Sequence, residues 1–404
     1  MAPSNDSSAI CTLPLPDTFG FDVSTETGEI RDQIESPFDR QRRNHFRRAV
    51  AQEIMVGYRP VKQLLSCGAA LGKVQVWKAL ESTTAHLIGA QSCGHVWLCG
   101  VCSPKISVKR GHKLARALVA SAHLGVGVAL VTLTLRHQSQ ETFSDVLTRL
   151  SQLFSSLTDG RFASTFREQF SVVGTVRVIE VTHGLHGWHP HVHQLLFFQG
   201  FQDLALMRES VFRKWCATSK KLWGDELGNA AVDVRDGRDA ALYVSKMGLE
   251  AELVGAPWKS GRTSSSLTQF QLLDSPNEQA RTLFREFGES ISRSGEKRSR
   301  TFRQVVWSRG LAKGLGLDEE LSDEEIASQH EEPARLLGQL TSAQWRVLTD
   351  SGREAIPNVL RLAATTGWPA VESFIALLAG SQLPPRGADE PSFNAAQRKN
   401  HVRN

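Results

Sequence analysis

The chain has 404 residues, of which 41% are hydrophobic and 22% charged, and its formal net charge is +5. This length allows two or three domains, and the composition is that of a globular protein, not a largely disordered one. The mild basicity permits nucleic-acid binding without arguing for it. The longest apolar stretch, residues 123–135, is too short for a membrane span, and the N-terminus lacks the pattern of a secretory signal. We therefore expect a cytoplasmic protein with no membrane partner.

The first part of the chain combines a polar N-terminus with a basic helix. Residues 1–38 show little hydrophobic periodicity, which predicts a disordered segment. Helical periodicity begins at residue 39 and continues to residue 55. The arginines of this helix are Arg40, Arg42, Arg43, Arg47 and Arg48. They offer a surface that can lie along phosphates, but a solvated helix face explains them without a ligand and is the preferred interpretation.

A cysteine module follows the basic helix. Cys99 and Cys102 form a Cys-x2-Cys knuckle, with Cys93 six residues before it and Cys67 further upstream. In a reducing compartment such clustering indicates a metal and not disulfides, and four thiolates suit a tetrahedral structural Zn²⁺. His95 is an alternative to Cys93 as a ligand. Unligated thiols are disfavoured because the knuckle stands between polar and basic segments and not in an apolar run.

The middle of the chain mixes strand and helix patterns. The expected strands lie at 127–137, 175–184, 191–200 and 231–235, and the expected helices at 114–125, 141–160, 203–224 and 239–247. Gly160 and Gly224 are expected to end their helices, and residues 183–190 are expected to form a hairpin loop. This mixture predicts an α+β domain with a central antiparallel sheet that helices cover on one face.

The region after the α+β domain is basic from residue 285 to residue 313 and then turns acidic, before several short helical patterns. These observations predict five parts. They are a disordered segment (1–38), a basic helix with a four-cysteine zinc module (39–115), the α+β domain (116–284), a basic segment with a helical C-terminal domain (285–384) and a disordered tail (385–404).

The segment GWHPHVHQLLFF, residues 187–198, is the most informative. Alternate side chains of a strand point to the same face, so His191 and His193 project side by side. Two imidazoles are half of a metal site, and Glu180 on the partner strand offers an oxygen ligand from the same face. His183 or His189 can replace Glu180 as the third ligand. Such a set leaves coordination positions open for a phosphate oxygen. A His-x-His pair taken alone is common and often has no function.

Tyrosine is scarce, since Tyr58 and Tyr243 are the only two. Asp239, Tyr243 and Lys246 are spaced to lie along one face of a predicted helix. A phenol, with a pKa of about 10, is a poor nucleophile unless a cation or base assists it. Lys246 can steady developing negative charge, and Asp239 can activate a water or a second nucleophile. A half-buried tyrosine beside a solvated lysine is the alternative interpretation of this helix taken alone.

Together these segments resemble the rolling-circle replication initiators, or Rep proteins, of the HUH endonuclease superfamily, in the branch that uses a single catalytic tyrosine. Residues 131–137 look like the first motif, residues 180–197 like the second with its histidine pair, and residues 239–246 like the third with its nucleophile. The second motif is highly specific and the first is weak, while the third gains weight from the shared order. The resemblance covers residues 60–250 well.

The resemblance implies an HUH endonuclease fold and a metal-dependent, site-specific nicking and closing activity at a plasmid double-strand origin. Tyr243 would cut single-stranded or extruded origin DNA and leave a 5′-phosphotyrosine and a free 3′-hydroxyl. Mg²⁺ or Mn²⁺ held by His191, His193 and Glu180 would assist the cut. A host helicase and polymerase would extend the 3′ end, and the protein would rejoin the displaced strand.

The resemblance also concerns termination. In this branch an acid four residues before the tyrosine promotes the terminating cleavage. Asp239 stands there, where many members have glutamate, and Asp236 is the runner-up. His183 stands where an aromatic residue is expected, which leaves the third metal ligand open.

Two alternatives belong to other functional classes. The chain can be a relaxase or a transposase of the same superfamily, which the neighbourhood of its gene on a small circular plasmid would decide. It can also be a non-catalytic zinc DNA-binding protein. A Tyr243→Phe variant separates that protein from the enzymes, because an enzyme would keep origin binding and lose nicking.

Overall fold

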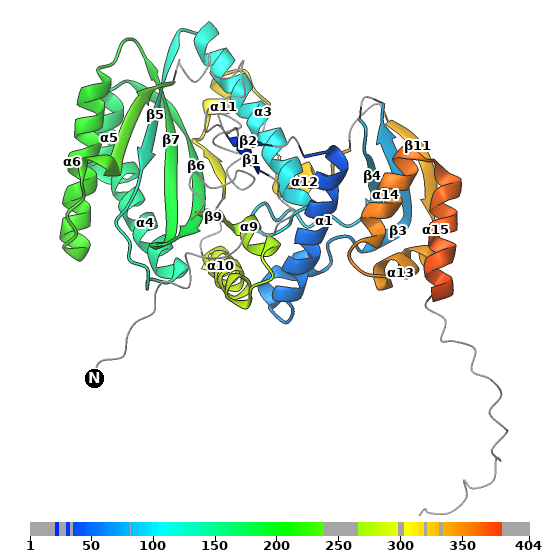
Figure 1. Cartoon of the computed structure of the whole chain (residues 1–404). Helices are drawn as coiled ribbons and strands as arrows, with labels where there is room; N and C mark the ends of the chain where they lie inside the picture. The colour runs from blue at the N-terminus through cyan, green and yellow to red at the C-terminus, as the bar shows by residue number, and fades with distance from the viewer. Residues whose placement is uncertain are drawn as a thin grey trace, which may run out of the picture. The chain divides into compact units, whose positions relative to one another are not determined.

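The computed structural model describes residues 21–23, 30–32, 35–80, 82–237, 266–297, 303–318, 321–330 and 334–381. The chain forms two compact units (Figure 1). The first comprises Met1–Leu71 and Gly89–Glu332, and the second comprises Gly72–Ile88 and Pro333–Asn404. The second unit is therefore assembled from two stretches that lie far apart in the sequence.

The first unit is built on an antiparallel sheet with the strand order β10-β6-β7-β5-β8, in which β9 also pairs with β6. The strands are β5 (Val126–Leu133), β6 (Val172–Gly184), β7 (Gly187–Gln199), β8 (Val232–Asp236), β9 (Leu267–Thr268) and β10 (Val305–Trp307). β7, which carries the histidines, is the central strand of this order. Because partners on both edges satisfy its backbone hydrogen bonds, β7 is a rigid platform for its side chains. The predicted α+β class with an antiparallel sheet is confirmed.

The helices of the first unit follow the predicted periodicity in part. They are α1 (Pro37–Ile54), α2 (Lys62–Leu65), α3 (Cys102–His123), α4 (Phe143–Thr158), α5 (Gly160–Gln169), α6 (Leu204–Trp223), α9 (Gln269–Asp274), α10 (Glu278–Lys297), α11 (Leu311–Gly314) and α12 (Asp323–Ser328). Ser36 caps α1 and Asp203 caps α6, which ends at Gly224 with a φ of 74°, so both predicted helices are confirmed. The predicted helix 141–160 ends before Gly160, which opens α5, a helix that was not predicted.

Short elements complete the first unit. They are the two-stranded ladder of β1 (Phe21–Val23) with β2 (Ile30–Asp32), and the 3-10 turns η2 (Arg59–Val61) and η3 (Asn229–Ala231).

Helices cover both faces of the central sheet. Val192 and Leu196 of β7 belong to the main core, with residues of α4, α6 and α10. Leu195 and Phe197 point the opposite way and pack in a second core with residues of α3 and α11. Figure 1 shows α4, α5 and α6 on one side of the sheet and α3 and α11 on the other. The expectation of a single covered face is therefore wrong. Beyond His193, β7 carries apolar side chains on both faces, and both must be buried.

The hairpin between β6 and β7 is tighter than predicted. The pairing continues through His183 with Trp188 and Gly184 with Gly187, so only residues 185–186 form the turn. Gly187 has a φ of 82°, a conformation that glycine adopts without strain. The predicted hairpin loop 183–190 is thus mostly strand, and this extension includes His189 in the rigid part of β7.

The second unit is a small sheet packed against helices. Its strands, in the order β11-β3-β4, are β3 (Ala70–Ala79), β4 (Ala85–Ala90) and β11 (Ala334–Leu340), and its helices are α13 (Ser342–Asp350), α14 (Ala355–Thr365) and α15 (Trp368–Ser381). Val74 and Val76 of β3 share a core with Trp345 of α13 and Leu360 of α14. No strand was predicted in either contributing stretch.

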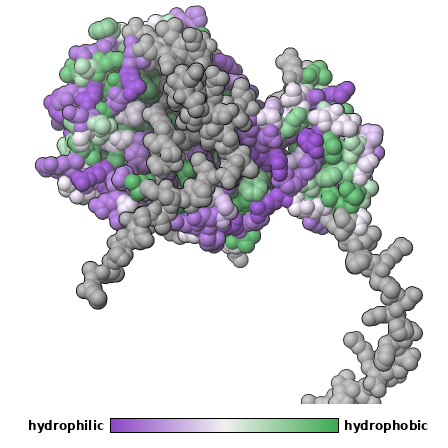
Figure 2. Space-filling model, in the orientation of Figure 1, coloured by the Kyte–Doolittle hydropathy of each residue, from purple (hydrophilic) through white to green (hydrophobic). Residues whose placement is uncertain are grey.

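Figure 2 shows hydrophilic side chains over much of the drawn face of the first unit, with smaller hydrophobic areas between them. In the described part of the chain, no helix combines the length and apolar character that a membrane crossing requires.

Candidate active site and metal centre

One face of the central sheet carries a row of three histidines. His189, His191 and His193 alternate with Trp188, Pro190 and Val192 along β7, so the three imidazoles share a face. Glu180 of β6 pairs directly with His191 in the antiparallel register. The structure therefore brings together the histidine pair and the carboxylate that the sequence suggested as a ligand set.

His193 has a polar partner on each side of its ring. Its Nδ1 lies 3.1 Å from Oγ1 of Thr132 on β5, and its Nε2 lies 3.2 Å from Oε2 of Glu180 on β6. The side chains of His193 and Glu180 are 15% and 25% exposed, so the pair is partly accessible to solvent. Thr132 belongs to the first motif, and sequence reasoning did not assign it a role.

A second imidazole contact extends the row. His137, which follows β5, places its Nε2 2.5 Å from Nδ1 of His189, and its Nδ1 lies 2.8 Å from the backbone oxygen of His186. The His189 and His191 rings meet edge to face, with centroids 4.1 Å apart. Burial, reinforced by His137, lowers the pKa of His189 to about 4, and burial likewise lowers the pKa of His137. Neutral imidazoles of this kind can bind metals or accept protons.

His183 lies apart from this row. It pairs with Trp188, whose buried ring belongs to the main core on the opposite face of the sheet, and the two ring centroids are 4.9 Å apart. Burial lowers the pKa of His183 to about 4. Of the two alternative third ligands, only His189 shares the face of His191 and His193.

The histidine face, formed by His189, His191 and His193 of β7 with Glu180 of β6, fits a divalent cation in part. The 3.2 Å between Nε2 of His193 and Oε2 of Glu180 matches adjacent ligands on an octahedral ion, which lie about 3.0 Å apart for bonds of about 2.1 Å. The His191 and His193 ring centroids are 6.2 Å apart and the rings are inclined by 27°. Within the described residues, the ligand atoms of this histidine and glutamate set lie less close together than the four cysteine sulfurs do.

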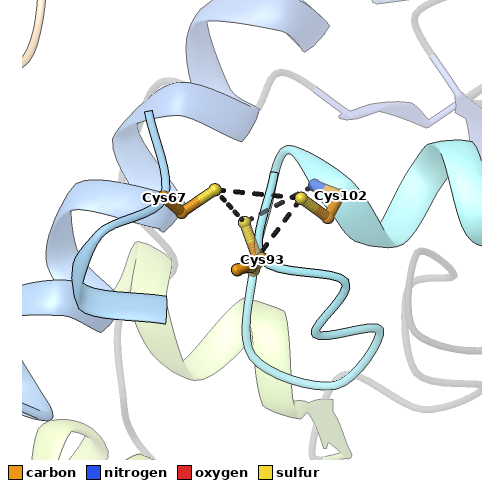
Figure 3. Close-up of side chains that lie close together, drawn as sticks. Cys67, Cys93 and Cys102 are labelled. Carbon is orange, nitrogen blue, oxygen red and sulfur yellow. Dashed lines mark hydrogen bonds between the residues drawn. The ribbon is translucent and has the colours of Figure 1, made fainter. Parts of the chain in front are cut away.

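The four clustered cysteines form a compact buried centre. Their Sγ atoms all lie within 4.8 Å of one another. Cys67 Sγ lies 3.6 Å from Cys99 Sγ and 3.8 Å from Cys102 Sγ, and Cys93 Sγ lies 3.7 Å from Cys102 Sγ. Figure 3 shows Cys67, Cys93 and Cys102 approaching from separate segments, with Cys102 at the start of α3.

These distances suit a zinc ion. Sulfurs at the corners of a tetrahedron with Zn–S bonds of about 2.3 Å lie roughly 3.8 Å apart. Hydrogen bonds from Cys67, Cys93 and Cys99 lower the pKa of Cys102 well below its usual range, so the cluster already favours a thiolate. The buried four-cysteine group can thus hold a metal such as zinc. The alternative ligand His95 is not part of the four-residue cluster.

The arginines of α1 do not form a continuous surface for phosphates. Arg47 is buried and forms an ion pair with Asp274, and Arg43 lies 2.6 Å from Glu35. Arg48 is also buried. Internal packing therefore occupies part of the predicted basic surface.

The tyrosine helix lies outside the described residues, and with it Tyr243, Asp239 and Lys246. The other tyrosine, Tyr58, is half-buried beside the main core and donates its hydroxyl to the backbone oxygen of Glu289 at 3.2 Å. Tyr58 therefore has a structural partner.

Asp236, the alternative acid for termination, is the last residue of β8. It pairs with Ala129, whereas Asp233 pairs with Thr132, the threonine beside His193. Because side chains alternate along a strand, Asp236 lies on the sheet face opposite the histidines.

Comparisons with known proteins show that part of the chain is similar to replication proteins. A family model described as "Replication protein" matches residues 84–216, which include Cys93, Cys99, Cys102 and the whole histidine strand. A Streptomyces lividans protein named "Protein rep" is 24% identical over 301 residues, which cover 58% of this chain and 66% of that protein. A Streptomyces cyanogenus protein named "Neomycin resistance protein" is 27% identical over 141 residues, covering 29% of this chain and 32% of that one. The matched regions thus span just under two thirds and about a third of these relatives. No solved structure matches the chain.

Proposed function

We propose that the chain is a plasmid replication protein of the Rep family, to which residues 84–216 are similar, and that it initiates rolling-circle replication by nicking one strand at a plasmid double-strand origin. The observation that carries the proposal is the row of histidines on the central strand, with Glu180 3.2 Å from His193. An imidazole and carboxylate set beside open coordination positions can orient and polarise a phosphodiester.

We propose Tyr243 as the nucleophile. Its phenolic oxygen would attack the scissile phosphorus, and the bond from phosphorus to the 3′ oxygen would break. The phenol loses a proton and the departing 3′ oxygen gains one, so a 5′-phosphotyrosine and a free 3′-hydroxyl result. Rejoining is the reverse reaction, with the 3′-hydroxyl attacking the phosphotyrosine. This retains the energy of the phosphodiester bond without a cofactor that carries energy.

The chain before Tyr243 is long enough to reach the histidines. Gly237 lies against Val128, which pairs with Phe197, four positions along β7 from His193. Since β5 separates β8 from β7, spacings of about 3.4 Å per residue and about 4.8 Å between strands put Gly237 roughly 17 Å from His193. With residues 239–243 in the predicted helix, which rises about 1.5 Å per residue, the backbone from Gly237 to Tyr243 spans at most roughly 13 Å, and the long tyrosine side chain would cover the remaining distance.

The proposed roles of the remaining site residues follow from their chemistry. Mg²⁺ or Mn²⁺, when bound by His191, His193 and Glu180, would act as a Lewis acid toward the phosphate. Lys246 would steady the charge on the phosphate during attack. Asp239 would activate the water or second nucleophile that ends a round of replication.

We also propose that the four-cysteine group holds structural Zn²⁺. The sulfur separations of 3.6 to 3.8 Å support it, as does the burial of all four side chains. The substrate would be single-stranded or extruded origin DNA, and a host helicase and polymerase would use the new 3′ end. Cytoplasmic localisation is part of the same proposal.

A plasmid nicking assay tests the proposed function. Supercoiled origin plasmid should become open circular with Mn²⁺, and His193→Ala should abolish this while DNA retention remains, because basic side chains supply most of the affinity for DNA. The exposed His112 on α3 offers a control, since His112→Ala should nick normally. Undiminished nicking in EDTA would contradict the metal-assisted mechanism.

The related alternatives remain open to experiment. A relaxase or transposase would cut transfer or element ends and leave the plasmid origin intact. A non-catalytic zinc DNA-binding protein would retain the origin without nicking it under any metal condition.

A further inference from the structure

Arg48 is a buried cation that lacks a partner among the described residues. Its side chain is only 9% exposed, and its Nε has no hydrogen-bond partner. The carboxylates beside the same helix pair with other arginines, Glu35 with Arg43 and Asp274 with Arg47. Only the Nε atom is fully buried without a partner, so the guanidinium is largely withdrawn from water, and an anionic neighbour would stabilise it.

The guanidinium of Arg48 lies at the loop that carries Cys67. A Cβ placed on Gly68 would lie 2.5 Å from Nη1 of Arg48 and 2.9 Å from its Cζ. Because Gly68 directly follows Cys67, standard backbone dimensions put Nη1 within roughly 8 Å of the Cα of Cys67. The positive φ of 88° at Gly68 favours glycine here.

The loop that carries Cys67 and the knuckle of Cys99 and Cys102 both pack on the same face of α1. One turn after Arg48, Gln52 donates its side-chain amide to the backbone oxygens of Leu64 and Cys67, each at 2.9 Å. The knuckle packs alongside, since a Cβ on Gly100 would lie 3.2 Å from the backbone nitrogen of Arg48. Helix α1 thus holds Arg48 against the cysteine centre through contacts on either side of it.

A zinc ion with four thiolate ligands carries a formal charge of −2, and it would be the missing counter-charge. We propose that Arg48 is a positioning residue for this centre, whose buried guanidinium offsets the excess negative charge of the thiolates and so raises zinc affinity. The inference rests on the proposed zinc but is independent of nicking. It also gives α1 a role other than binding phosphates.

Zinc affinity of the full-length protein tests this inference. Competition with a chromophoric chelator should show that Arg48→Met weakens zinc binding by about 10- to 100-fold, the range typical of outer-shell substitutions. Arg48→Lys, which keeps the charge, should recover most of the affinity. Arg40→Met is the matched control on the same helix, because the Arg40 side chain is 59% exposed, and it should not change zinc binding.

The effect of Arg48→Met on stability, measured with and without zinc, separates charge compensation from simple packing. With zinc bound, Arg48→Met should lower the urea midpoint, but with excess chelator the variant should be at least as stable as the wild type, since an uncompensated buried cation has been removed. If Arg48→Met fails to fold, Arg48→Gln serves for the same comparison.

Two outcomes would overturn the inference. One is unchanged zinc affinity in Arg48→Met, and the other is an equal loss of stability with and without zinc. A wild-type protein that purifies without zinc would instead refute the zinc centre itself. That result would leave the nicking proposal untouched.

Discussion

At the scale of single residues, the direction of the hydrogen bonds around His137 follows from the backbone. A carbonyl oxygen only accepts, so the contact with the His186 oxygen places a proton on Nδ1 of His137. Burial lowers the pKa of both His137 and His189, so both rings are neutral near pH 7. The Nε2 of His137 therefore accepts from Nδ1–H of His189, which leaves Nε2 of His189 unprotonated.

Replacing His137 should therefore weaken the histidine face. His137→Phe keeps a ring but loses both hydrogen bonds, so the His189 ring, which packs edge to face on the proposed ligand His191, loses its support. We therefore expect Mn²⁺ affinity and nicking to fall by about 10-fold, the lower end of the range for partners of metal ligands. His137→Gln offers one acceptor and one donor and should restore much of the Mn²⁺ affinity and of the nicking activity. Calorimetric Mn²⁺ titration and the imidazole ¹⁵N shifts of His189 would check this. Wild-type metal affinity and unchanged ¹⁵N shifts in His137→Phe would refute the positioning role.

Some residues of the site could be predicted from the sequence, and others could not. The shared face of His191 and His193 follows from the period of two along any strand, and Glu180 follows from the hairpin register. The contact between Thr132 and His193 was not predictable, because it depends on the pairing of β5 with β7 across more than fifty residues of chain. Burial of Arg48 likewise comes from tertiary packing, and local polarity suggested a solvated face.

At the scale of elements, the cysteine knuckle and α1 approach each other closely at Gly100. A Cβ there would lie 2.5 Å from the backbone oxygen of Asn44 and 2.8 Å from Cβ of Arg47. Because a helix backbone cannot yield as a flexible side chain can, Gly100→Ala should separate the two elements and lower the free energy of unfolding by about 1–3 kcal/mol.

Urea unfolding measures this cost. Gly228→Ala is the matched control, since a Cβ there would meet nothing within 4 Å and its φ is −78°, which alanine tolerates. We expect the control to change the midpoint little. Equal midpoints for Gly100→Ala and Gly228→Ala would show that the knuckle is not tightly packed on α1.

Elements with strong local patterns were predicted well, and others were not. Helices α1 and α6 have caps and end signals within their own sequences. Strands β3 and β11 were missed because each is stabilised by pairing with the other, and more than two hundred residues separate them. The extension of β6 and β7 through the predicted hairpin loop was missed because glycine and proline there suggested a longer turn.

At the scale of the whole molecule, buried neutral histidines should make the protein sensitive to acid. The pKa values of His183 and His189 are about 4 in the folded chain, against 6.5 for the ordinary side chain. Between these values the unfolded chain binds more protons, so stability falls as the pH drops from about 6.5 towards 4. The urea midpoint should therefore be lower at pH 5 than at pH 7.5.

A variant identifies the source of this acid sensitivity. His183→Phe keeps an aromatic ring against Trp188 and removes one titrating group, so its midpoint should depend less on pH than that of the wild type. The same midpoint at pH 5 and pH 7.5 in the wild-type protein would refute the assignment of these histidines as buried and neutral.

The arrangement of the two units could not be anticipated from sequence order. The second unit takes residues 72–88 from within the predicted zinc module and residues from 333 onward from the predicted C-terminal region. Composition changes along the chain reveal boundaries only where a unit is continuous. The clustering of the four cysteines, in contrast, was predictable from their spacing. Their burial in the main core was not, because the segments around the knuckle are polar and basic.

The central claim is that a tyrosine on this chain cuts DNA beside the histidine face, and one measurement tests it most directly. The protein is incubated with Mn²⁺ and a single-stranded origin oligonucleotide, and the covalent adduct is digested and mapped by mass spectrometry. We expect the 5′ end of the cleaved DNA on Tyr243, no adduct in Tyr243→Phe, and an unchanged adduct in Tyr58→Phe. DNA attached to Tyr58, or efficient cleavage by Tyr243→Phe, would contradict the account.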